Sequence, residues 1–357
     1  MSSYEKIYVP LFVCFIPCLL IFPSAAFSGA LSAVELCFST IIPSLFAFMV
    51  ISEAAILMLS DKKLPLCLCS MLLKVDPCCE ASILLSFLGG YPVGVRCISV
   101  LYENGRISAG QARRLSLCLV NPSPVFMITA VGMKMLSSIK AGIILCISVY
   151  AANIIVSLGL VFFRNLQEFS GQKQSLKKEV KLPYDSPSVI FVNSVKSSSV
   201  AMLYICMFTI FFGTVSGVFS AFTENTYILS AVKGILEVTV GCRSLTDSGI
   251  LYLPYFAIIL SFGGLCVMLQ VICFSQNYSV FTGQFLLVRV ISSVIAFVIA
   301  RALCIFYNPA VSVFSNTSQN ISPQSEYGFF SSILVVIAAI VFVLSTSKSI
   351  DKIKGAL

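Results

Sequence analysis

Four short stretches of this 357-residue sequence place Gly, Pro and polar side chains inside long apolar runs. They cover residues 89–94, 121–124, 237–241 and 261–264. Each combines residues that interrupt a helix with groups that can bind a polar solute or an ion. Non-helical backbone at membrane depth leaves N–H and C=O groups that need a protein, water or ligand partner. The four breaks therefore supply the candidate binding residues.

The first break contains Gly90, Tyr91, Pro92 and Gly94, and Arg96 follows shortly after it. Pro92 suits the first turn of a returning helix. A guanidinium near such a turn can pair with an anionic solute. The alternative is a tight structural turn whose Arg96 side chain extends to the inner membrane surface.

The second and fourth breaks offer uncharged polar groups. Asn121 and Ser123 alternate with two prolines, which predicts an unwound segment with free carbonyls, or alternatively a simple kink. Ser261 precedes the pair Gly263 and Gly264. That pair predicts another break, although it could instead allow two helices to pack closely.

The third break places an acid in an apolar setting. Glu237, Thr239 and Gly241 form its core, and Arg243 could face the same cavity. An ionisable residue at membrane depth is a functional candidate by default. A structural ion pair of Glu237 with Arg243 or Lys233 is the alternative.

Further ionisable and polar side chains lie within apolar runs. The candidates for coupling to an ion are Glu53, Asn121, Glu237 and Gln270. Arg289 and Arg301 also lie within one apolar run, where each could contact a ligand or form an internal ion pair.

The composition requires a lipid environment for most of these segments. Apolar types make up 58% of the residues and charged types 11%, whereas soluble domains carry about 25% charged residues. This excludes a soluble fold, a disordered chain and a nucleic-acid-binding module. The net charge of +8 is then explained by the positive-inside bias of membrane proteins.

The absence of His removes the commonest general base and metal ligand, so we expect no metal, no cofactor and no enzymatic activity. Of the 15 Cys, the set Cys67, Cys69, Cys78 and Cys79 lies in one short segment. Without C-x2-C pairs, these residues are interpreted as reduced cytoplasmic thiols rather than a metal site.

The apolar runs predict an all-α polytopic membrane protein with eight transmembrane helices. The predicted spans are 7–23, 41–59, 115–137, 141–163, 200–222, 250–274, 284–306 and 328–346. Two interrupted runs, 81–104 and 228–248, are predicted to enter the membrane and return. Placing both termini in the cytoplasm puts 16 of the 23 Lys and Arg on the inner side and none in the outer loops 24–40 and 307–327.

The two halves predict an inverted repeat. Each has an amphipathic piece (28–39 or 188–199), three full crossings and one re-entrant hairpin, and an odd number of crossings turns the second copy upside down. The predicted regions are 1–40, repeat one at 41–163, a cytoplasmic linker with an amphipathic segment at 164–199, repeat two at 200–306, and 307–357. Inverted repeats with discontinuous helices are typical of secondary transporters.

Several short motifs resemble a known family. They are GYPVG (90–94), LYENGRIS (101–108), NPSP (121–124), LEVT (236–239) and SFGGL (261–265). In this order they are similar to YlbJ-type sporulation integral membrane proteins, also called stage V sporulation protein V, which carry a nucleoside-transporter-like gate domain. The resemblance implies two re-entrant hairpins and dipicolinate as cargo. Pro122 departs from the wider gate-domain group, where a small or polar residue is expected.

We therefore expect a transporter that binds a small organic anion between the two hairpins and works by alternating access, with a coupling cation or proton. The resemblance implies dipicolinate during endospore formation, in the bacterial membrane that the mother cell places around the forespore. The expected partners are the solute and the lipid bilayer, an oligomer is compatible, and nucleic acid is not a partner. A nucleoside-type transporter and a non-transporting scaffold of a sporulation complex are the alternatives.

Overall fold

Helices form all the regular secondary structure in the part of the chain that the computed structural model describes. The described residues are 15–59, 68–165, 186–223, 225–249, 251–280 and 282–307, and all lie in the first of two units, Met1–Ser312. The predicted last span 328–346 and most of the predicted linker lie outside the described residues.

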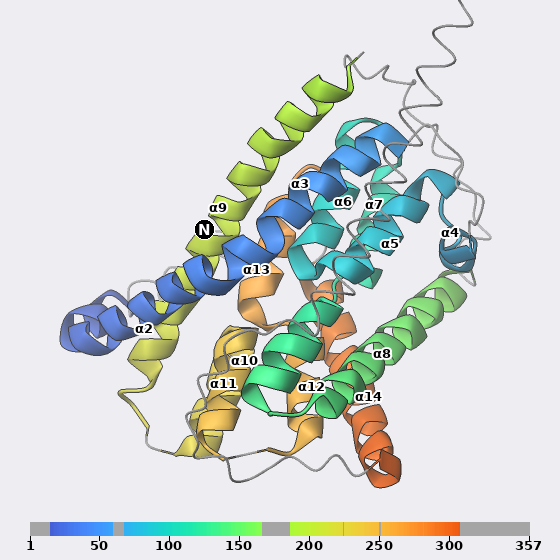
Figure 1. Ribbon diagram of the computed structural model, residues 1–357. Helices are drawn as coiled ribbons and strands as arrows, with labels where there is room; N and C mark the ends of the chain where they lie inside the picture. Colours follow the sequence, from blue (N-terminus) through green and yellow to red (C-terminus); the bar gives the residue numbers. More distant parts are fainter. Residues whose placement is uncertain are drawn as a thin grey trace, which may run out of the picture. The chain divides into compact units, whose positions relative to one another are not determined.

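The helices and their order along the chain are shown in Figure 1. They are α2 (Pro23–Leu36), α3 (Ile42–Leu59), α4 (Leu68–Leu73), α5 (Glu80–Gly89), α6 (Tyr91–Glu103), α7 (Ala109–Cys118), α8 (Ile139–Asn165), α9 (Pro187–Phe219), α10 (Thr226–Leu236), α11 (Val238–Asp247), α12 (Leu253–Phe262), α13 (Gly264–Phe274) and α14 (Thr282–Tyr307). Two π-helices, η1 (Cys37–Ile41) and η3 (Phe126–Met135), and a short 3-10 helix, η2 (Pro77–Cys79), complete the set.

Four helical segments are long and apolar enough to cross a membrane. They are Ile139–Phe162, Pro187–Phe219, Leu253–Phe274 and Thr282–Phe306. A fifth is counted if the bent pair at the N-terminal end of the described chain forms one span. The protein is therefore membrane-embedded, with four or five spans by length and composition in the described part.

One predicted boundary coincides with a bend, and another is wrong. The predicted first span 7–23 ends where the chain turns by 99° between the helices Phe15–Ile21 and Pro23–Ser39, because Phe22 leaves helical geometry and Pro23 starts a new helix. The pieces predicted separately as 188–199 and 200–222 form one helix of 33 residues, α9. The residues on both sides of that predicted boundary are apolar or carry a hydroxyl group. None of these residue types stops a helix.

Small residues bring α2 and α9 into close contact, and the two helices run side by side in Figure 1. A side-chain carbon on Gly29 would lie 2.3 Å from the Gly213 carbonyl oxygen, and one on Gly217 would lie 2.2 Å from that of Ala25. Such spacing of small residues lets membrane helices approach with their backbones in contact.

Two helical hairpins form where the sequence predicts interrupted runs. In the first, α5 and α6 meet at Gly90, and Cys78 before α5 lies 3.8 Å from the Arg106 carbonyl beyond α6. In the second, α10 and α11 meet at Glu237, and the hydroxyls of Ser230 and Ser244 are 2.9 Å apart. In each hairpin, the second helix therefore runs back alongside the first.

The hairpins approach the middle of α12–α13 from opposite ends. The open end of the second hairpin leads directly into α12 through residues 248–252. The open end of the first lies at the far end of α13, where the Asn277 amide donates to Glu103 at 3.2 Å. Since α12–α13 is a 22-residue segment, about 33 Å separates these ends.

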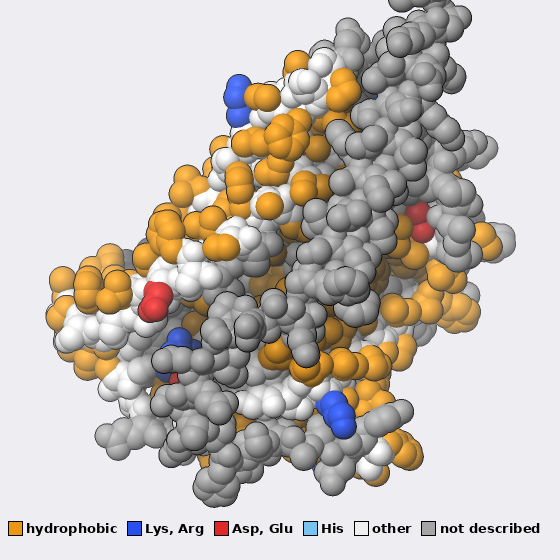
Figure 2. Space-filling model, viewed as in Figure 1, with side chains coloured by type: hydrophobic (Ala, Val, Ile, Leu, Met, Phe, Trp, Pro, Cys, Tyr) orange, Lys and Arg blue, Asp and Glu red, His pale blue; other side chains and the backbone are white. Residues whose placement is uncertain are grey.

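The last long helix of each half packs differently. α8 lies along α14 and along η3, which follows the break in its half, whereas α14 lies along α8 and along α12, which precedes the break in its half. The outer faces are apolar: Figure 2 shows hydrophobic side chains along the visible edge, and α2 and α9 expose Phe27, Phe191 and Leu203. This surface suits contact with lipid.

Candidate functional site

The tip of each hairpin touches the break in its own half. Gly90 has φ of 92°, and a side-chain carbon there would lie 3.1 Å from the Ser123 backbone nitrogen. Gly264 has φ of 75°, and a side-chain carbon there would lie 3.1 Å from the Leu236 carbonyl oxygen. Both positions need the left-handed backbone and the small volume of Gly. The four predicted breaks therefore meet in two pairs.

Tyrosine hydroxyls satisfy several carbonyls that the breaks leave free. Tyr91 at the first tip is buried and donates to the carbonyl of Leu260 in the last turn of α12. Tyr150 of α8 donates to Phe87 at 2.5 Å and to Pro122 at 3.1 Å. Tyr91 thus joins the first hairpin to the broken helix of the other half.

Arg289 of α14 occupies the second break. Its guanidinium donates to the carbonyls of Val120 and, at 3.2 Å, of Leu117, and the residue is 2% exposed. These carbonyls lie at and just beyond the C-terminal end of α7, where the helix dipole is negative, so backbone groups match the charge. The ring of Phe285 lies 5.5 Å from the guanidinium carbon. Carbonyls, rather than the carboxylate of an internal ion pair, are the partners observed for Arg289.

Two residues predicted in the second break are held by neighbouring groups. The Asn121 side-chain oxygen Oδ1 accepts from the Asn153 amide, while the Asn121 Nδ2 is buried with no hydrogen-bond partner. The Asn153 oxygen in turn accepts from Ser157 at 3.0 Å. Ser123 accepts a hydrogen bond from the Phe126 nitrogen at 3.1 Å and so stabilises the start of the next helical segment.

The third break is a single residue rather than the predicted five. Glu237 is 7% exposed, and its carboxylate accepts from the Val240 nitrogen at 2.7 Å as the N-cap of α11. Thr239 lies in the first turn of α11, and Gly241 packs against Gly234.

Arg243 does not share a cavity with Glu237, contrary to the prediction. Its side chain is 75% exposed and pairs with Asp247 at 3.8 Å, one turn further along α11. The joint pairing of one anion by Arg96 and Arg243 is therefore wrong. Glu237 caps the start of α11 and is buried, whereas Arg243 lies within α11 on an exposed face.

The remaining predicted residues lie in or near the core. Pro92 is in the first turn of α6, and Gly94 packs against the Leu119 carbonyl. At the fourth break Ser261 is buried at the end of α12, and Gly263 takes a left-handed conformation. The Gln270 amide is buried and lies 3.4 Å from the Cys266 sulfur.

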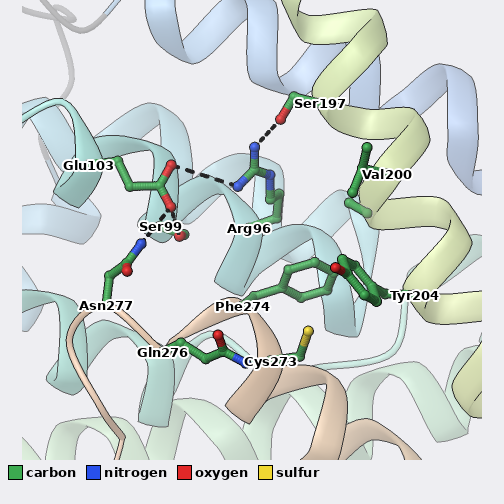
Figure 3. Close-up of a pocket in the computed structure, with 11 residues that line it drawn as sticks. Arg96, Ser99, Glu103, Ser197, Val200, Tyr204, Cys273, Phe274, Gln276 and Asn277 are labelled. Carbon is green, nitrogen blue, oxygen red and sulfur yellow. Dashed lines mark hydrogen bonds and ion pairs between the residues drawn. The ribbon is translucent and has the colours of Figure 1, made fainter.

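A polar pocket of about 430 Å³ lies beside the first hairpin (Figure 3). Its walls come from α6, α9, the end of α13 and the residues that follow α13. Arg96 and Glu103 of α6 point into it, and the rings of Tyr204 and Phe274 lie on the other side. Ionic and aromatic groups thus face one cavity.

Arg96 has partners on three helices. Its Nη2 is 3.2 Å from Glu53 Oε1 of α3 and also donates to the Ser197 hydroxyl of α9, and its Nη1 is 3.9 Å from Glu103 Oε2. The Ser198 hydroxyl donates to Glu53 at 3.3 Å. The structure therefore brings together two predicted residues, Arg96 and Glu53, as a partly buried ion pair at the pocket wall.

Several residues at these sites were not predicted from sequence. Asn153 and Tyr150 of α8 could have been found, because polar residues in an otherwise apolar span usually face protein. Ser197 and Asn277 lie next to other polar residues in the sequence, so nothing in the sequence marks them as site residues. In the described part of the chain, no group of three or more Cys, Asp or Glu has a geometry that could hold a metal ion.

Comparisons of the chain with protein-family models, with curated proteins and with solved structures found no match.

Proposed function

We propose that this protein is a membrane transporter for a small organic anion, which binds in the polar pocket beside the first hairpin. The observation that carries the proposal is the meeting of two oppositely approaching hairpins with the broken segments, next to a pocket that contains Arg96. A guanidinium within a membrane-embedded protein favours an anionic solute.

The proposed architecture is an inverted repeat with eight spans and both termini in the cytoplasm. In it α3 corresponds to α9, and α8 corresponds to α14. The hairpins correspond to each other, as do the two broken spans. The different packing of α8 and α14 is then a departure from exact symmetry. Such asymmetry is expected of a transporter described in one of its two access states.

The proposed access is from the side where α6 and α13 end. At the hairpin tips, Tyr91, Tyr150 and Arg289 satisfy free carbonyls, and the contacts of Tyr91 and Arg289 also join the two halves. These contacts close the path beyond the pocket, and exposing the solute to the other side requires them to separate. Movement of one substructure against the other would achieve this.

The proposed cargo is dipicolinate, moved across the membrane around the forespore, as the sequence resemblance implies. The pocket supports it through Arg96, which can pair with a carboxylate, and through Tyr204 and Phe274, whose rings can face an aromatic solute. A nucleoside is the alternative cargo.

Uptake of labelled dipicolinate into proteoliposomes tests the proposal. We expect saturable uptake that falls at least about tenfold in Arg96→Gln, because one charge-assisted pair is worth roughly that factor or more. Arg243→Gln is the matched control and should retain uptake, since Arg243 is exposed on another hairpin. An intact chain that shows no saturable uptake of dipicolinate or uridine would contradict a transport function.

A scaffold in a sporulation complex is the second candidate, and one observation favours it. Arg96 already has internal partners in Glu53 and Ser197, so a structural role alone could account for it. A scaffold predicts that a cell carrying Glu237→Ala or Arg96→Ala, with normal protein levels, forms spores with normal dipicolinate content. Spores depleted of dipicolinate would favour transport.

A further inference from the structure

Acidic side chains outnumber basic ones in the ionic cluster at the pocket. Arg96 faces two carboxylates, that of Glu53 at 3.2 Å and that of Glu103 at 3.9 Å. With all three groups ionised, this cluster carries one net negative charge. Such a cluster opposes the entry of an anion unless one carboxylate is neutralised.

The two carboxylates depend on Arg96 to different degrees. The Glu103 side chain is 39% exposed and accepts hydrogen bonds from Ser99 at 2.8 Å and Asn277 at 3.2 Å. Figure 3 shows both donors beside Glu103, so this carboxylate keeps support and water if the guanidinium turns away.

Glu53 lacks that support. Its side chain is 8% exposed, and its charged partner is Arg96. If a ligand carboxylate takes the guanidinium, Glu53 is left with the α9 hydroxyls of Ser197 and Ser198. A buried carboxylate that loses its cation costs several kcal/mol, and binding a proton removes the charge.

We infer that an anion binds at Arg96 together with one proton, which the Glu53 carboxylate accepts. This inference rests on the proposed transport function and specifies its coupling. The ligand carboxylate replaces Glu53 Oε1 at the guanidinium, and the released Glu53 takes a proton from water. Binding then changes the net charge of the pocket by the charge of the anion plus one positive charge. A proton gradient across the membrane can therefore drive transport of the anion.

Other titratable groups near Glu53 do not offer a second acceptor. Within the described residues, α6 presents Arg96 and the buried thiol of Cys97 to Glu53, and α9 presents the hydroxyls of Ser197 and Ser198. A neutral thiol and two hydroxyls do not take up protons near neutral pH. Glu53 is therefore the group assigned to the proton.

Calorimetric titration of the full chain in detergent with dipicolinate tests the inference. Measured at pH 7 in two buffers that differ in ionisation enthalpy, the heats give the number of protons taken up per bound ligand. Dipicolinate is itself fully ionised at this pH. We expect about one proton for the intact chain and for Glu103→Gln, and none for Glu53→Gln, whose amide keeps the size of the side chain.

The outcomes separate the inference from the proposed function. Binding without proton uptake by the intact chain, or the same uptake in Glu53→Gln, overturns the inference and leaves transport intact. Should Glu53→Gln not fold, the proton count of the intact chain decides. If the intact chain neither binds nor transports dipicolinate or uridine, the proposed function fails and this inference fails with it.

Discussion

Arg289 offsets the free-energy cost of interrupting a helix inside a membrane. Its guanidinium satisfies the carbonyls of Leu117 and Val120, so the break and the buried charge compensate each other. We expect Arg289→Met to lower stability by about 2–4 kcal/mol, because it leaves buried carbonyls without donors. Thermal unfolding in detergent measures the change.

Arg301 on the same helix is the control for Arg289. It is exposed and donates to the Tyr252 hydroxyl at 2.7 Å, so Arg301→Met should change the unfolding temperature little. Equal losses in the two variants would show that the carbonyl contacts of Arg289 are not the source of its effect.

Glu80 gives a pH-dependent contribution outside the membrane-spanning segments. Its carboxylate accepts from the nitrogens of Cys69 at 3.1 Å and Ser70 at 2.7 Å. Burial alone would raise the pKa of Glu80, but these hydrogen bonds outweigh it and hold the pKa below its ordinary value. The ionised form therefore stabilises α4 against α5.

The sign of the Glu80 effect follows from that lowered pKa. Its stabilisation is complete above the unfolded pKa of about 4.3 and is lost as the pH falls through the lower folded pKa. Glu80→Gln should cost about 1–3 kcal/mol at pH 7, and the difference from the natural chain should shrink below about pH 4.5. Unfolding temperatures measured between about pH 2.5 and pH 8 test this. A difference that grows as the pH falls would refute the assigned cause.

At the scale of elements, small residues decide how α2 and α9 pack. Gly217→Leu should destabilise the protein by about 1–3 kcal/mol, because its side chain would meet the Ala25 carbonyl and the Gly29 backbone. Gly159→Leu on α8 is the matched control, since nothing lies within 4 Å of a side-chain carbon there. Detergent unfolding measures both, and similar behaviour of the two variants would argue against close packing of α2 on α9.

The helix interruptions were well located by sequence, and their partners were not. Gly90 and Gly263 adopt backbone angles that favour Gly, so local chemistry marks these positions. The extent of the third break was overestimated, because Glu237 caps α11 and lets the helix start at the next residue. Which hydroxyl or guanidinium meets each free carbonyl depends on contacts between segments far apart in sequence.

At the scale of the whole molecule, the hairpins should open to opposite sides of the membrane. Asn104 follows α6 and Asp247 ends α11, and these positions lie toward opposite ends of α12–α13. Single Cys at Asn104 or Asp247, in a chain whose other thiols are replaced, should react with an impermeant reagent from opposite sides of the membrane. Labelling of both from the same side would contradict the inverted repeat.

The sequence by itself determined the lipid solvent and the approximate positions of the four interruptions within the apolar runs. Apolar content and residues such as Pro and Gly act locally, so they need no tertiary information. Only the tertiary structure decided that Arg96 pairs with Glu53, that Arg243 faces outward, and that Arg289 meets backbone carbonyls. A side chain's partner depends on which helices pack together and at what rotation, and a pattern of apolar runs leaves that rotation undetermined.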